Sequence, residues 1–131
     1  MADYKNLWRR TCINDAQLNA IIKGRAYPQH VSAVDGPKYP CVSLHAINRE
    51  PDNSAKGIKD GDYQMDAWAP IEDDADEIQD CLERLFHEEV ITGEGVRVNF
   101  CRSRSRHDGL YQREDNVFHK VSMWIVKWSE T

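Results

Sequence analysis

The spacing of hydrophobic residues along the chain predicts two helices. Residues 14–24 (NDAQLNAIIKG) place aliphatic side chains on one helical stripe between an N-capping asparagine and a C-capping glycine. Residues 72–90 carry a longer stripe of the same period, and acids crowd the first turn, where the helix dipole favours them. The residues of the capping box expected there are Asp73 or Asp74 with Asp76 and Glu77.

Alternation of apolar and polar residues predicts four strands, at residues 41–47, 62–69, 96–101 and 116–130. In the third strand, Val96, Val98 and Phe100 are expected to point inward, with Arg102 in the same phase unless a bulge intervenes. The proline-rich residues 25–40 are expected to form an ordered loop or an extended arm. The order α-β-β-α-β-β predicts an α+β fold: an antiparallel sheet of about four strands with two helices packed on one face.

Composition narrows the class of protein. A chain of 131 residues with 40% hydrophobic residues is expected to form one domain, residues 1–131. No stretch approaches the roughly 20 apolar residues of a membrane span or the apolar core of a signal peptide, so a cytoplasm-like compartment is expected and no membrane partner. The net charge of -5 argues against a general nucleic-acid binder. The four scattered cysteines predict reduced, mostly buried thiols.

A search for catalytic motifs finds neither a phosphate-binding loop nor a nucleophile elbow or zinc-protease pattern. Asp62 and Asp66 share one face of a predicted strand, and His45 and His119 lie on different strands that could meet. These two pairs define an enzyme alternative, but solvent-facing and structural roles are the more common ones for such residues. We therefore expect no enzyme, no cofactor and no metal site.

The charges are segregated along the chain. Residues 72–80 hold six acids, whereas the following strand and loop hold five arginines. In NFCRSRSRH, a strand would aim Arg102, Arg104 and Arg106 in one direction, although a loop is expected after Cys101. These charges could pair within the chain, solubilise it, or join neighbouring copies head to tail, with exposed tryptophans as apolar anchors. The arginines are Arg97, Arg102, Arg104, Arg106 and Arg113, and the tryptophans are Trp8, Trp124 and Trp128.

Several segments together resemble one protein family. They are GRAYP, YPCVSLHAI, YQMDAWAPIEDDADEI, IQDCLERLF, GVRVNF and FHKVSMWIVKW. In order, spacing and residue character, the stretch from Leu18 to Trp128 is similar to the tail-completion or tail-terminator proteins of long-tailed bacteriophages and gene-transfer particles. The arginines after Phe100 and the cysteines depart from that family's pattern.

The resemblance implies a non-enzymatic ring, commonly of six subunits, at the head-proximal end of the tail tube. Such a ring ends tube polymerisation and offers a surface to the head connector or neck. It belongs to the head–tail junction of the virion and is assembled in the host cytoplasm. DNA passes through its lumen without sequence-specific binding.

Two groups of site residues follow as hypotheses. A subunit interface would join Arg102, Arg104 and Arg106 to Asp73, Asp74, Asp76 and Glu77. A loop would face the tube, the neck or the lumen, through Arg49, Asp52, Lys56 and Lys59. A small nucleic-acid-binding module that uses the three arginines remains the alternative.

Overall fold

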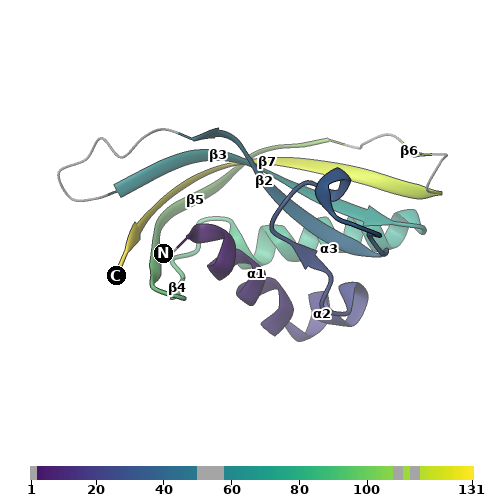
Figure 1. Cartoon of the computed structure of the whole chain (residues 1–131), viewed down its shortest axis with the longest axis horizontal. Coiled ribbons are helices and arrows are strands. Elements are labelled where there is room, and N and C mark those ends of the chain that lie inside the picture. Colours follow the sequence, from purple (N-terminus) through teal and green to yellow (C-terminus); the bar gives the residue numbers. More distant parts are fainter. Residues whose placement is uncertain (1–2, 50–57, 108–110, 113–115) are drawn as a thin grey trace.

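The computed structural model describes residues 3–49, 58–107, 111–112 and 116–131. A long curved sheet forms one layer, and the helices of the described residues cover its concave face (Figure 1). The helices are α1 (Tyr4–Asn14), α2 (Ala16–Ile22) and α3 (Glu72–Phe86), with a 3-10 turn, η1, at Val31–Ala33.

The sheet has seven strands in the described residues. They are β1 (Ala26–Tyr27), β2 (Cys41–Arg49), β3 (Ile58–Ala69), β4 (Thr92–Gly93), β5 (Val96–His107), β6 (Tyr111–Gln112) and β7 (Val117–Glu130). Their order is β1-β2-β3-β7-β5-β4, and β6 pairs with β7 off this path. Strand β1 runs parallel to β2 whereas the other pairs are antiparallel, so the sheet is mixed.

The predicted fold class is therefore wrong: three helices and a mixed seven-stranded sheet replace two helices and an antiparallel four-stranded one. The missing helix is α1, whose side chains at helical spacing, among them Trp8, are buried against the sheet. Asp3 caps α1 by accepting a hydrogen bond from the Lys5 amide at 3.0 Å. The missing parallel strand lies inside the proline-rich segment, where Ala26 pairs with Val42.

The helix caps also differ from the prediction. Asn14 ends α1, and Asp15 caps α2 by accepting a hydrogen bond from the Leu18 amide at 2.9 Å. Helix α3 starts after Ile71, which makes no side-chain cap, so the predicted capping box is absent. The acids of the first turn lie as predicted near the positive end of the dipole.

The main core lies between the concave face and the helices. It contains residues from every helix and from β2, β3, β5 and β7. The three tryptophans expected as exposed anchors, Trp8, Trp124 and Trp128, are buried in it. The four cysteines are free and buried, as predicted. No helix in the described part of the chain is long and apolar enough to span a membrane.

Candidate subunit interface

Two β-bulges in strand β5 control where its side chains point. The register with β7 shifts between Val98 and Phe100 and again between Ser103 and Ser105. Val98 is buried as predicted, but after the first bulge Cys101 turns inward and Phe100 is 41% exposed. The inward position predicted for Phe100 is therefore wrong, and the strand continues to His107 where a loop was expected.

The second bulge separates the three arginines. Arg102 lies opposite Ile125, which in turn lies opposite Asp62, so Arg102 belongs to the convex face. Arg104 lies within the bulge and approaches Asp62 on that face at 3.9 Å. Arg106 turns toward the helices and donates to the Asp80 carboxylate at 3.1 Å and to Gln79 at 3.2 Å. The arginines do not share one direction, because a bulge reverses the alternation of side chains.

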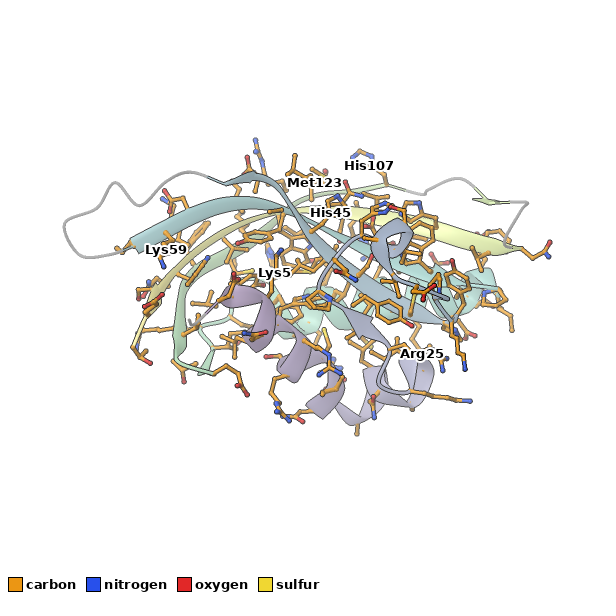
Figure 2. The ribbon with its side chains drawn as sticks, in the orientation of Figure 1. Lys5, Arg25, His45, Lys59, His107 and Met123 are labelled. Carbon is orange, nitrogen blue, oxygen red and sulfur yellow. The ribbon has the colours of Figure 1, made fainter. Side chains whose placement is uncertain are left out.

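The convex face carries a groove at this position, with a volume of about 350 Å³. Its apolar lining includes Met123 and Ile47, whose side chain is 49% exposed. Asp62 and Arg104 supply charged walls. Figure 2 shows Met123 and His107 on this side of the molecule, opposite the helices, whereas Arg25 lies on the helix side. We call this feature the convex groove; it is lined by Ile47, Asp62, Arg104, Ser105, Met123 and Trp124.

The start of helix α3 carries the acids of the predicted interface. Lys120 of β7 reaches Asp76 at 2.9 Å and Glu72 at 3.6 Å. Glu77 accepts a hydrogen bond from Gln17 at 3.4 Å. Two of the predicted interface acids, Asp73 and Asp74, have no side-chain partner among the described residues.

Ile71, directly before these acids, is 59% exposed, the largest value among the exposed large hydrophobic side chains of the described residues. An apolar side chain thus stands beside carboxylates that the rest of the described chain does not neutralise. We call residues 71–74 the acidic corner.

A second hollow, of about 180 Å³, lies along the edge of β5. Its apolar lining includes Val90, which is 58% exposed, and Phe100. Its charged wall, unlike that of the convex groove, is acidic, because Glu88 and Glu89 line it.

The loop residues proposed to face the tube or lumen are only partly described. Asp52 and Lys56 lie outside the described residues, as does Arg113. Arg49 ends β2 opposite Gly61. Lys59 lies on β3, binds Glu130 at 3.0 Å and stands 4.8 Å from the centre of the Trp128 ring.

Next to the convex groove, the convex face holds a buried polar cluster that the sequence only hinted at. Asp66 is fully buried and lies 2.9 Å from His119 Nε2 and 3.6 Å from His45 Nδ1. Gln64 donates to the same carboxylate at 2.7 Å. The Trp68 ring stacks on His119 with centroids 3.6 Å apart. The two histidines of the enzyme alternative thus meet, but around Asp66 and without Asp62.

The polar cluster holds strands and loop together. Trp68 donates to the Ser43 hydroxyl at 3.0 Å, so β2, β3 and β7 all contribute to it. The loop that contains η1 covers it, with Val31 packed in the apolar cluster around Trp68 and the His30 ring 5.1 Å from that of His45. Burial lowers the pKa of His45, although Asp66 acts in the opposite direction. Among the described residues, no three His, Cys, Asp or Glu side chains form a group that could hold a metal ion.

Comparison with known proteins identifies the family. The family model for tail completion protein gp17 matches residues 9–123. The chain belongs to this family. It is therefore a structural protein of a phage-type tail and a component of the virion.

A solved structure shares the fold. Its title reads "Virion of native gene transfer agent (GTA) particle", and the match has a TM-score of 0.71 over 92% of this chain and 90% of that one. The two sequences are 11% identical, so this likeness concerns the fold alone. A search of curated proteins finds no match to the sequence.

Proposed function

We propose that this tail completion protein forms a closed ring, most simply of six copies, at the head-proximal end of the tail tube. The ring stops addition of tube subunits and presents a surface to the head connector or neck at the head–tail junction. It assembles in the host cytoplasm, and DNA passes through its lumen without sequence-specific contacts. Each copy contributes one domain.

The observation that carries this proposal is the placement of opposite charges on different sides of one chain. Arg102 and Arg104 lie on the convex face, whereas Asp73 and Asp74 lie at the start of α3. A contact between unlike surfaces is heterologous, and it closes into a ring when the rotation per copy allows.

The wider interface keeps the residues predicted from the sequence. Arg106, Asp76 and Glu77 already have partners in the same chain, so they would contribute charge around the contact rather than its centre. We propose Arg49 and Lys59, at the ends of the β2–β3 connection, with Asp52 and Lys56 between them, as contacts to the tube, the neck or the lumen.

Native mass spectrometry of the purified protein across a series of protein and salt concentrations tests the ring. We expect a closed oligomer that loses subunits as salt rises, because salt screens exposed charges. Binding to duplex DNA, measured in the same salt series, separates the ring from a nucleic-acid-binding module. Strong, steeply salt-dependent DNA binding by a monomer would favour the module.

A further inference from the structure

We propose that the acidic corner of one copy inserts Ile71 into the convex groove of the next copy. In this contact, Asp73 and Asp74 pair with Arg102 and Arg104. The proposal rests on the proposed ring and names the residues of its seam. The proposed occupant of the groove is a second copy of this chain.

The first reason is that each surface lacks something that the other supplies. The groove is an apolar hollow with an exposed isoleucine, Ile47, on its wall. The acidic corner presents an exposed isoleucine, Ile71, at a turn between β3 and α3. A hydrophobic side chain that enters a hollow and is ringed by charged pairs is the usual anatomy of a specific contact.

The second reason is charge. In the described residues, Arg102 has no side-chain partner, and Arg104 has only a distant one, Asp62 at 3.9 Å. Asp73 and Asp74 are likewise unneutralised by the described chain. Opposite charges that find no partner within a chain favour association between chains and fix its orientation.

Charge also decides between the two hollows. The hollow at Val90 and Phe100 is lined by Glu88 and Glu89, so an incoming acidic corner would meet like charge there. The convex groove has Arg104 in its wall and Arg102 close by on the same face. Like-charge contacts oppose docking, so the acidic corner selects the convex groove.

Mixing two variants tests the contact and its direction. Ile71→Asp removes the inserted side chain, and Ile47→Asp places an acid in the groove. We expect each variant alone to assemble at least about tenfold more weakly than the wild-type chain. Mixed together, they should form dimers and nothing larger, because only one intact corner and one intact groove can meet.

Val90→Asp is the matched control. Val90 is exposed to nearly the same extent as Ile71 and is also next to acidic residues in the sequence, but it lies at the other hollow. We expect this variant to assemble like the wild-type chain. If Ile71→Asp also assembles like the wild type, the proposed contact is wrong, while the ring itself remains supported.

Cross-linking gives a second readout that needs no closed ring. A chain carrying both Ile71→Cys and Ile47→Cys should form a ladder of disulfide-linked multimers on mild oxidation. Its natural cysteines are buried and do not compete. A control chain with Val90→Cys and Ile47→Cys should not form the ladder.

The two measurements separate failure of the contact from failure of the ring. A ladder from a chain that never closes into an oligomer would support the contact and contradict a ring that forms free in solution. No ladder above the control, whatever the oligomeric state, would overturn the contact.

Discussion

The two faces of the sheet are built from different chemistry. The concave face lies under three helices, and its core is rich in aromatic and aliphatic side chains, including Trp8, Trp124 and Trp128. The convex face has a polar cluster around Asp66 at one end, under the loop that contains η1. The groove beside Arg102 and Arg104 lies next to this cluster on the same face, since Met123 in its lining pairs with Gln64.

This difference separates two tasks. Burial of large apolar side chains against the helices supplies most of the favourable free energy of folding. The convex face has hydrogen bonds and charges whose net contribution to folding is smaller, but whose geometry is specific. Stability should therefore respond mainly to changes in the core on the concave side, and assembly to changes in the convex groove and at the acidic corner.

The largest expected effect is on the concave side. Trp8→Ala removes a fully buried indole and should lower the free energy of unfolding by about 3–5 kcal/mol. Phe100→Ala, at a half-exposed position of the convex face, should cost less than about 1 kcal/mol. Chemical denaturation of both variants measures the difference. Equal losses of unfolding free energy in the two variants would show that stability does not depend mainly on the concave side.

A smaller effect is expected at the buried polar end of the convex face. Asp66→Ala leaves His119 and Gln64 without their shared acceptor and should cost about 1–3 kcal/mol. Asp62→Ala, on the same strand face but partly exposed, should change stability by no more than about 0.5 kcal/mol. Thermal unfolding of the two variants compares the loss of a buried carboxylate with the loss of a partly exposed one. If Asp66→Ala leaves the stability unchanged, the cluster contributes nothing to folding.

On the helix side, an exposed polar contact should contribute less to the free energy of unfolding than the side chains of the buried core. Asp15 caps α2 and accepts hydrogen bonds from Arg84, and this pairing lowers the pKa of the Asp15 carboxyl below its ordinary value of 3.8. Asp15→Ala should cost about 1–2 kcal/mol. Asp15→Asn should cost less, because an asparagine still caps the helix.

The pH dependence of this contact has a defined sign. A lowered pKa means that the Asp15 charge stabilises the folded chain above the ordinary value and stops doing so as pH falls through the folded value. The difference in the free energy of unfolding between wild type and Asp15→Asn should therefore be largest near neutral pH and disappear in acid. Denaturant titrations at several pH values check this, and a difference independent of pH would contradict it.

The smallest effect is expected at His45. Its pKa lies below the ordinary 6.5 because burial disfavours the charged ring, and His30, His119 and Lys5 act in the same direction against Asp66. Protonation of His45 therefore destabilises the folded chain: its stabilising contribution is full above 6.5 and is lost as pH falls through the lowered pKa. His45→Gln should lose less stability than wild type when pH is lowered over that range. A larger acid loss in His45→Gln would reverse the assigned sign.

The sequence predicted the parts of the fold that have strong periodicity. The stripe of α3 and the alternation of β3 and β7 are as expected, because each is long enough for its period to stand out. Helix α1 was missed although Tyr4 and Trp8 repeat at helical spacing. The two arginines that follow Trp8 make the segment polar overall and hide this repeat. The pairing of Ala26 with Val42 is a long-range contact between short segments, which no local pattern encodes.

The candidate site was predicted in composition but not in geometry. The arginines and the acids were identified, yet the sequence gives no signal for a bulge between Ser103 and Ser105. Without that bulge, Arg106 would be assigned to the convex face with Arg102 and Arg104, and not to α3. Asp66 and His119 come together only through the register of β3 with β7.

The bulges in β5 have an evolutionary consequence. Which arginine faces which side depends on the number of residues between two register shifts, rather than on the identity of any residue. A single-codon deletion of Arg104 would remove the bulge and take one arginine from the convex face, while Ser105 stays opposite Met123 and Arg106 stays turned toward α3. Relatives could thus gain or lose a charged seam by a change in length alone, without a substitution.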